Sequence, residues 1–472
     1  MFMNFFRFVI FLVIFFLNNL FALSQESYLR ERRFVPQLHL KGEFGYTYSK
    51  GTVILIDLQN ADTVTCTAKV KWRGASSNIV GKHKRNYRIK LTTDQSFLGM
   101  RKDKDWILDA GQADVFRLRN RVATELWNDF ARKPYYLDRE PKVLTGVRGK
   151  VVEVFLNDEY RGVYCLTEVV DRKELRLKKN NGNIIHGQLW KSKGYGASLM
   201  SGDIPFYDNT SDVWDVFETK YPEFKDGMQA DYKPLWRSIN FVSKSSDKDF
   251  KDSVAYYFDL PVVEDYYIFV QTLNAVDNIG KNLYMGIYDQ QTSPMITFSV
   301  WDLDLSVGSI YLKNYSEKFI SPEYPLENMN LIERLIRTDA AGFREKVRKR
   351  YQDARQNILS TDSLIARYRH YYELLKESGA AAREEKKWSG DTDVSGAEIN
   401  FDKEINYISN WITRRMRYLD AHVFFLPTGL KSITNSNIKE NEAYYTLEGI
   451  KLNGKPCHKG IYIYKGKKVM LR

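Results

Sequence analysis

The sequence predicts an α+β protein with a strand-rich N-terminal half, a helical C-terminal half and a small β module at the C-terminus. Three patterns carry this prediction: β-branched and aromatic runs recur before residue 170, apolar residues recur at helical spacing after residue 260, and short strand-like runs separated by Gly return after residue 430. The chain has 472 residues, of which 43% are hydrophobic and 28% charged, so disordered, collagen-like and coiled-coil architectures are excluded as the main structure.

Residues 1–24 are predicted to form a secretory signal peptide. Arg7 precedes an apolar run at 8–17, and the small residues Ala22 and Ser24 follow it. A transmembrane anchor is the competing interpretation, because the apolar stretch lengthens if the neighbouring polar residues are tolerated. No later apolar run is long enough to cross a membrane, so after removal of the signal we expect no integral span and an extracytoplasmic location, in the periplasm, on the cell surface or outside the cell.

A strand-rich lobe is predicted over about 36–175. Runs with high β propensity stand at 53–58, 65–74, 87–91 and 151–170. The last of them contains an Asn-Asp pair between two such runs, which is typical of a hairpin. One amphipathic helix interrupts the strands over about 114–132, and Asp114 stands in position to cap it.

The second half of the chain is predicted to be mainly helical. Residues of about 180–255 are rich in Gly, Asn, Ser and Asp and are expected to form an irregular insertion. A helical lobe follows over about 256–426, with one short strand at 295–301. Pro427 and Gly429 mark a boundary, after which residues 430–472 are expected to form the small β module.

The positions of the cysteines and the net charge limit the kinds of metal site and binding partner that we expect. Cys66, Cys165 and Cys457 are widely spaced, so we predict neither a disulfide framework nor a zinc site. The formal net charge of +12 favours anionic partners such as acidic glycans, although solvated surface lysines also account for it. No nucleic-acid-binding motif accompanies the charge, so no nucleic-acid partner is expected.

Two acidic segments contain the candidate catalytic groups. Asp277 and Asn282 lie five positions apart at the end of a predicted helix, and Asp302 and Asp304 follow a predicted strand. Phosphoryl-transfer enzymes use this Asp-to-Asn spacing to place a base beside the acceptor hydroxyl and a carbonyl ligand beside magnesium, and a further carboxylate completes the metal site. A local salt bridge with Lys281 is the alternative role of Asp277, because acidic residues near turns often have only structural partners.

A basic segment in the strand-rich lobe is the candidate phosphate site. Arg73 precedes a Gly-Ala-Ser-Ser turn that contains Ser76 and Ser77, and Lys84 and Lys90 follow. Backbone amides and hydroxyl groups of such a turn can bind phosphate, with the neighbouring cations supplying charge. The segment has neither Walker nor G-x-G-x-x-G spacing, and an ordinary hairpin is the alternative.

Taken in order, these segments resemble the CotH kinase family. The resemblance rests on four motifs: WRGASS with KHKRNYRIKL at 72–91, DWILDAGQADVFRLRNRVATEL at 105–126, YRGVYCLTEVVDR at 160–172, and D-x-x-x-x-N at 277–282 with WDLDLSVG at 301–308. It implies a divergent, two-lobed protein-kinase-like fold over 25–426 and the phosphorylation of hydroxyl groups on a protein substrate, with ATP and Mg²⁺ as cofactors.

The resemblance also implies a role for each candidate residue. Asp277 would orient or deprotonate the acceptor hydroxyl, Asn282 and Asp302 would bind magnesium, and Asp304 would be the alternative metal ligand. The remaining positions would contact the nucleotide or orient a lysine that does so, and they are Arg73, Ser76, Ser77, Lys84, Lys90 and Glu168, with Glu125 in place of Glu168 as an alternative.

Departures from the kinase pattern leave other functions open. Ala275 and Val276 stand where protein kinases have His-Arg, and no Phe-Gly follows Asp302, so a catalytically inactive scaffold that binds glycan or a partner protein is the alternative. Its binding surface would be either the basic surface or the aromatic residues of the insertion, namely Trp190, Tyr195, Phe206, Tyr207, Trp214 and Phe217. A glycoside hydrolase with paired carboxylates is a third alternative. The C-terminal module resembles that of many secreted Bacteroidetes-type proteins, which implies an export or surface-attachment signal.

Overall fold

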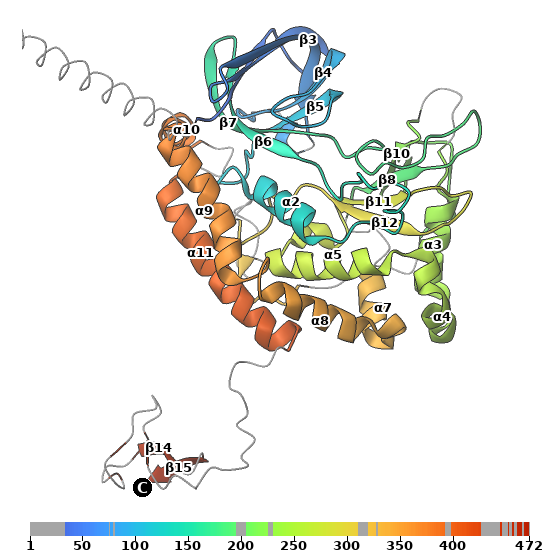
Figure 1. Ribbon diagram of the computed structural model, residues 1–472, viewed down its shortest axis with the longest axis vertical. Helices are drawn as coiled ribbons and strands as arrows, with labels where there is room; N and C mark the ends of the chain where they lie inside the picture. Colours follow the sequence, from blue (N-terminus) through green and yellow to red (C-terminus); the bar gives the residue numbers. More distant parts are fainter. Residues whose placement is uncertain are drawn as a thin grey trace, which may run out of the picture. The chain divides into compact units, whose positions relative to one another are not determined.

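Strands of the N-terminal half close into a barrel in the computed structural model (Figure 1). The strands are β1 (Gln37–Lys41), β2 (Ser49–Asp57), β3 (Asp62–Arg73), β4 (Asn86–Gln95), β5 (Asp103–Asp109), β6 (Gly149–Leu156) and β7 (Glu159–Thr167). Their order is β1-β2-β3-β4-β5-β7-β6, and β1 closes the barrel by pairing in parallel with β6. Apolar side chains at alternate positions, such as Leu38 and Leu40 of β1, fill the interior.

The structure describes residues 34–74, 76–78, 81–194, 204–224, 230–309, 320–326, 329–391 and 398–425, with short pieces between 444 and 471. The predicted signal peptide at 1–24 lies outside these residues. No helix within them is long and apolar enough to cross a membrane. The chain divides into two compact units, Met1–Leu426 and Pro427–Arg472.

The predicted strands of the first lobe are confirmed, but their closure into a barrel is a result that the sequence pattern did not show. The turn between β6 and β7 has positive φ at Asn157 (50°) and Asp158 (69°), the values expected for the predicted hairpin. Strands β1 and β5 were not identified, and the parallel pairing of β1 with β6 joins segments that are distant in sequence. Local alternation carries no information about such long-range pairing.

A second sheet lies beside the barrel and contains segments predicted to be irregular (Figure 1). Its order is β12-β11-β8-β10-β9, with β8 (Gln188–Ser192), β9 (Val213–Trp214), β10 (Phe217–Tyr221), β11 (Leu283–Ile287) and β12 (Ile296–Val300). The expectation of an irregular insertion at 180–255 was therefore wrong, because β8, β9 and β10 find their partners only through tertiary pairing. The same segment forms α3 (Lys233–Lys244) and α4 (Asp247–Tyr257).

The aromatic residues of this segment mostly build the core. Trp190, Trp214 and Phe217 are buried, so they cannot form the binding surface proposed for a scaffold protein. Phe206 is exposed and stacks on Tyr207, with ring centroids 4.4 Å apart. The sixth residue of that proposed surface, at position 195, lies outside the described residues.

Helices supply most of the remaining framework. They are α2 (Arg119–Phe130), α5 (Leu260–Leu273), α7 (Asn330–Thr338), α8 (Phe343–Arg355), α9 (Thr361–Glu377), α10 (Ala380–Trp388) and α11 (Phe401–Tyr418). Helix α2 begins five residues later than predicted, because Arg117 has a positive φ of 65°. Asp114 nevertheless contacts the start of the helix, since its carboxylate accepts a hydrogen bond of 2.8 Å from the backbone N–H of Arg119.

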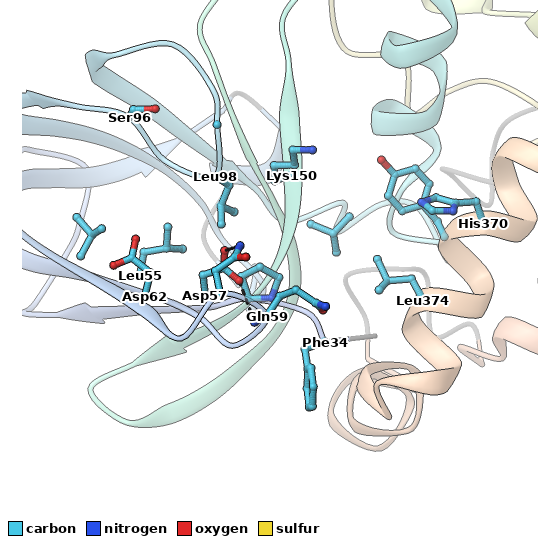
Figure 2. Close-up of a pocket in the computed structure, with 16 residues that line it drawn as sticks. Phe34, Leu55, Asp57, Gln59, Asp62, Ser96, Leu98, Lys150, His370 and Leu374 are labelled. Carbon is cyan, nitrogen blue, oxygen red and sulfur yellow. Dashed lines mark hydrogen bonds between the residues drawn. The ribbon is translucent and has the colours of Figure 1, made fainter. Parts of the chain in front are cut away.

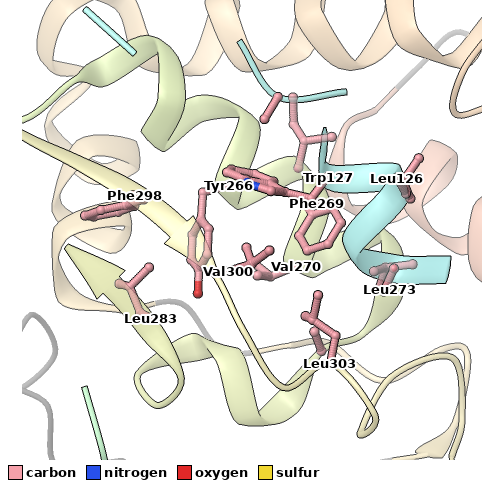
Figure 3. Close-up of a cluster of buried hydrophobic side chains, with 14 of the residues drawn as sticks. Leu126, Trp127, Tyr266, Phe269, Val270, Leu273, Leu283, Phe298, Val300 and Leu303 are labelled. Atoms are coloured by element: carbon pink, nitrogen blue, oxygen red, sulfur yellow. The ribbon is translucent and has the colours of Figure 1, made fainter. Parts of the chain in front are cut away.

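The core beneath the candidate site joins α2 and α5 to the second sheet (Figure 3). Trp127 of α2 packs edge-on against Phe269 of α5, with ring centroids 5.2 Å apart. Tyr266, one turn earlier on α5, contacts Phe298 of β12 in the same edge-on geometry at 5.4 Å. Burial of these large rings provides most of the apolar stabilisation at this position, and it holds the loops that follow α5 and β12 over one rigid base.

The second unit contains an antiparallel sheet in the order β13-β14-β15. Its strands are β13 (Tyr444–Tyr445), β14 (Gly460–Tyr464) and β15 (Lys467–Leu471). The predicted turn at 464–466 falls between two paired strands, while the predicted turn at 452–455 lies mostly outside the described residues.

Candidate functional site

A cavity of about 240 Å³ is bounded by the barrel on one side and the second sheet with its loops on the other. We call it the site cavity. Its polar lining comes from the ends of β3 and β5, from β8 and β10, and from the loops after α5 and β12. These residues are Arg73, Ser77, Asn86, Asp109, Gln112, Lys191, Lys193, Glu218, Asp277, Lys281, Asn282, Asp302 and Asp304.

The loop after α5 is held in place by Asn278, which is fully buried. The Asn278 side-chain amide donates a hydrogen bond of 2.9 Å to the backbone carbonyl of Trp301 at the end of β12. The hydroxyl of Tyr266 donates to the backbone carbonyl of Asn278. The first contact fixes the loop that contains Asp277 to the segment just before Asp302, and the second fixes it to α5.

Asp277 is a buried carboxylate of the site cavity, and its two oxygen atoms have different surroundings. It is 6% exposed, and its Oδ2 accepts a hydrogen bond of 2.8 Å from the ammonium of Lys281, so the local salt bridge considered from sequence is present. Its Oδ1 is buried and has no hydrogen-bond partner among the described residues. Burial raises the pKa of Asp277, and Lys281 opposes this shift. One carboxylate oxygen therefore remains available to accept a proton from a hydroxyl group in the cavity.

The three predicted metal ligands lie on the same cavity. Asn282 is 3% exposed, and its backbone N–H donates a hydrogen bond of 2.9 Å to the carbonyl of Ser192, which fixes it against β8. Asp302 has a φ of 60°, a left-handed conformation in which Asp and Asn are the best tolerated non-glycine residues. Asp304 accepts a hydrogen bond from the backbone N–H of Leu305, and loss of solvent, followed by the neighbouring carboxylate of Asp302, raises the pKa of Asp304 well above its ordinary value.

Asp109 and Asn120 are site residues that the sequence analysis missed. Asn120 of α2 donates a hydrogen bond of 2.7 Å to Asp109 and accepts one of 3.1 Å from the backbone N–H of Leu303. It thus joins the end of β5 to the loop after β12. Burial raises the pKa of Asp109. Asp109 follows an apolar run just as Asp302 does, and this shared pattern within 105–126 was the signal that could have identified it.

Cations line the barrel side of the cavity and the strand beside it. The guanidinium of Arg73 lies 5.0 Å from the ring centroid of Trp301, a cation–π contact that bridges the barrel and the second sheet. Lys191 and Lys193 come from β8 and the residue after it, in the segment predicted to be irregular, and were therefore not considered. Burial lowers the pKa of Lys191 to about 8, with Asp302 acting in the opposite direction.

The predicted turn after β3 is built by Gly74, Ser77 and Asn86. Gly74 has a φ of 114°, and a Cβ there would lie 2.0 Å from Oγ of Ser77, so the position requires glycine. The Ser77 hydroxyl accepts a hydrogen bond of 3.1 Å from Asn86 and lines the cavity. The side chain of Ser76 lies outside the described residues.

Three other predicted nucleotide-binding residues lie outside the lining of the cavity. Lys84 is 1% exposed and forms a 3.0 Å ion pair with Glu384 of α10. Lys90 lies on the outer surface of β4, with its ammonium 5.4 Å from the ring centroid of Tyr48. Glu168 is fully buried, where it accepts hydrogen bonds from the backbone N–H groups of Arg101 (2.7 Å) and Arg148 (3.0 Å). Glu125, the alternative to Glu168, accepts a hydrogen bond of 2.5 Å from the hydroxyl of Tyr371.

A larger cavity of about 710 Å³ lies at the other end of the barrel, against α9 (Figure 2). Asp57 and Asp62 from β2 and β3 face it together with His370 and Leu374 of α9. The carboxylate of Asp57 is engaged by its own turn, where it accepts hydrogen bonds from Gln59 (3.0 Å) and Asn60 (2.7 Å). None of the described residues predicted for the active site lines this cavity, so it is separate from the candidate site.

Comparison with known proteins identifies the family. A model of the CotH kinase protein matches residues 70–419. The chain belongs to the CotH kinase family. The match includes all residues that line the site cavity, whereas β1 and β2 of the barrel precede it. No curated protein matches the chain.

Membership of the CotH kinase family implies a nucleotide and a divalent metal, and the donor groups of the site cavity suit both. Among the described residues, no three His, Cys, Asp or Glu side chains are grouped closely enough to hold a metal ion by themselves. Magnesium, however, usually binds one or two carboxylates together with substrate phosphates. Asp302, Asp304 and Asn282 offer the hard oxygen ligands that magnesium prefers. The Oδ1 of Asp277 adds a buried polar atom that no described residue of the chain pairs with.

Proposed function

We propose that this CotH family protein is an atypical kinase that transfers the terminal phosphoryl group of ATP to a hydroxyl group of a protein substrate. The observation that carries the proposal is the presence of both carboxylates and cations in the lining of one cavity. Asp109 at the end of β5 and the loop residues Asp277 and Asp302 line the site cavity. The cations Arg73 and Lys191 line it as well. This is the combination that phosphoryl transfer needs, because catalysis of this reaction is mainly positioning and stabilisation of charge.

The residues of the cavity divide into three roles in this proposal. Arg73, Lys191 and Lys193 bind the phosphate oxygens. Asp277 accepts the proton of the acceptor hydroxyl through its free Oδ1, while Lys281 holds the other oxygen at 2.8 Å and fixes the orientation of the carboxylate. Asp302, Asp304 and Asn282 would hold Mg²⁺, which when bound would neutralise charge on the phosphate oxygens.

The volume of the cavity supports its assignment to the phosphate end of the nucleotide. At about 240 Å³ it is smaller than a pocket for a whole nucleotide-sized ligand, for which roughly 300 Å³ or more is usual. The barrel and the helical part of Met1–Leu426 would act as the two lobes of the implied kinase-like fold. Reaction outside the cytoplasm is proposed from the predicted signal peptide.

Ligand-induced stabilisation tests the nucleotide site. Thermal melting of the mature chain is measured with ATP and Mg²⁺, and the expected rise in melting temperature follows because a ligand that binds only the native state must stabilise it. Asp302→Asn should abolish the rise without disturbing the fold, since Asn tolerates the left-handed backbone at this position. Asp94→Asn, an exposed aspartate on β4, is the matched control and should behave like the wild type.

Phosphate transfer tests the catalytic role separately. With labelled ATP and candidate protein substrates, Asp277→Asn should keep the ATP- and Mg²⁺-dependent stabilisation but reduce the transfer rate by about 10² or more, the usual contribution of a general base. Stabilisation by ATP without transfer in the wild type would favour the catalytically inactive scaffold. Absence of any stabilisation at millimolar ATP would contradict a nucleotide site altogether.

A further inference from the structure

A row of exposed lysines crosses the neighbouring strands β2, β3 and β4 of the barrel. Lys50 of β2 stands directly opposite Lys69 of β3, and Lys69 stands directly opposite Lys90 of β4. All three side chains are exposed. Like charges directly opposite one another destabilise a sheet, so this arrangement opposes folding and is not explained by the architecture of the barrel.

A second pair extends the row along β3. Lys71 stands opposite Arg88 of β4 on the same face, since residues two apart on a strand share a face. The ammonium groups of Lys71 and Lys90 lie 4.9 and 5.4 Å from the ring centroid of Tyr48, and Arg88 pairs with Asp105 at 2.9 Å. We call the five cationic residues Lys50, Lys69, Lys71, Arg88 and Lys90 the basic track.

Within the described part of the chain, the lysines of the basic track form no ion pair with a carboxylate. Asp105 of β5 stands opposite Lys90 in the sheet, but its carboxylate pairs with Arg88 at 2.9 Å. A concentration of unneutralised charge on one face attracts an anionic partner and stabilises its complex.

The basic track leads to the site cavity. Lys69, Lys71 and Arg73 occupy alternate positions of β3, and Arg73 lines the site cavity itself. Arg73 and Arg88 also line an adjoining cavity of about 400 Å³, which shares Arg73 and Trp301 with the site cavity. Four acidic residues line this adjoining cavity too, so an acidic partner is expected to stay on the outer face of β3 and not to enter it; they are Asp105, Asp171, Asp212 and Glu223. A partner that follows the basic track along β3 from Lys69 therefore arrives at the proposed phosphoryl-transfer site.

We propose that the basic track docks an extended acidic segment of the protein substrate and presents the neighbouring hydroxyl residue to the site cavity. This inference rests on the proposed kinase function. The cations on β3 repeat every second residue, roughly 6.6 Å, and an extended peptide repeats its side chains on one face with the same period. β3 is paired on both sides by β2 and β4, so recognition is through side-chain charges and not through addition of a strand.

Peptide binding to the full chain tests the docking surface without nucleotide. The ligand is a fluorescently labelled peptide of about twelve residues with Glu at alternate positions and one Ser at its end, and its affinity is measured by anisotropy at low ionic strength. The triple variant Lys50→Gln, Lys69→Gln and Lys90→Gln should bind about tenfold more weakly, the size expected for the loss of three exposed ion pairs.

A matched triple variant separates the basic track from general charge. Lys251→Gln, Lys346→Gln and Lys349→Gln remove three exposed lysines from α4 and α8, and this variant should bind the peptide as the wild type does. Equal weakening in the two triple variants would overturn the proposal, as would tighter binding of heparin or of vesicles of anionic lipid than of the peptide. The unfolding temperature of the first triple variant should not fall, because the row of like charges is itself unfavourable.

The peptide-binding experiment tests the docking surface separately from kinase activity. The Asp277→Asn chain, which should lack phosphate transfer, is expected to bind the acidic peptide with wild-type affinity. Peptide binding with no phosphate transfer in the wild type would overturn the role of the segment as a substrate and would place the failure in the proposed kinase function. Phosphate transfer with no dependence on acidic residues in the substrate would overturn the docking proposal alone.

Discussion

Lys191 is the cation of the site cavity whose charge depends on pH near neutrality. Burial lowers its pKa to about 8, because the charged ammonium loses solvent on the second sheet, and the carboxylate of Asp302 limits the shift. Lys191 is therefore mostly protonated below pH 8 and loses its charge as the pH rises through that value. A phosphate group that binds beside it loses an ion pair over the same range.

The affinity for ATP and Mg²⁺ is expected to fall about threefold to tenfold between pH 7 and pH 9, the range typical of one lost ion pair. Lys191→Arg, which keeps its charge, should give a flatter profile over this range. Lys193→Arg is the control, because it changes an exposed lysine two residues away. This variant should show the same dependence of ATP affinity on pH as the wild type. Isothermal titration at several pH values measures this, and a flat wild-type profile would show that Lys191 does not contact the phosphates.

A fully buried carboxylate on helix α10 contacts the barrel and the loops beside it. Glu384 is fully buried and accepts hydrogen bonds from Nε of Arg117 (2.6 Å) and the backbone N–H of Val163 on β7 (2.7 Å), and it forms an ion pair with Lys84 (3.0 Å). Gly162 makes room for it: its φ is 106°, and a Cβ there would lie 2.2 Å from Oε2 of Glu384. One side chain thus satisfies three donors from separate elements.

Removal of this charge should destabilise the protein strongly. Glu384→Gln leaves Lys84 and Arg117 buried without a counter-charge, so the free energy of unfolding should fall by roughly 3–5 kcal/mol. Lys386→Gln, at an exposed position of the same helix, is the control and should change it by less than about 0.5 kcal/mol. Urea denaturation followed by circular dichroism measures both. Wild-type stability of Glu384→Gln would show that the charges of Lys84 and Arg117 are satisfied by their backbone partners alone.

At the scale of the whole molecule, the first unit has its own hydrophobic core. Among the residues that the structure describes, the core formed by α2, α5, the second sheet and α7–α11 is built from Met1–Leu426, and the barrel has a separate interior. Stability of a unit depends on the apolar surface that it buries itself. We therefore expect the first unit to fold without the second.

Deletion of residues 427–472 tests this expectation. The shortened mature chain should unfold cooperatively, with a melting temperature within about 2 °C of that of the full chain, which corresponds to less than about 1 kcal/mol for a protein of this size. Differential scanning calorimetry measures both forms. A large decrease in the melting temperature would show that the second unit contributes to the stability of the first.

The local pattern of the sequence was sufficient for much of the site. The Asp277 to Asn282 spacing and the strand before Asp302 are properties of consecutive residues, and both segments line one cavity as expected. The same reasoning could not place Lys84, because its partner Glu384 is separated from it by most of the chain. It also missed Lys191, since β8 becomes a strand only when β10 and β11 pair with it.

The sequence by itself determined the α+β class, the order of the predicted strands and helices, the family, and the acidic segments of the candidate site, because these follow from short-range periodicity and from motifs of neighbouring residues. Only the tertiary structure decided the closure of the barrel, the second sheet and the meeting of Asp109, Asn120 and Leu303. Those features depend on contacts between segments that are distant in sequence. Such contacts are favourable because two segments bury apolar surface against each other, and the sequence of either segment alone does not show this.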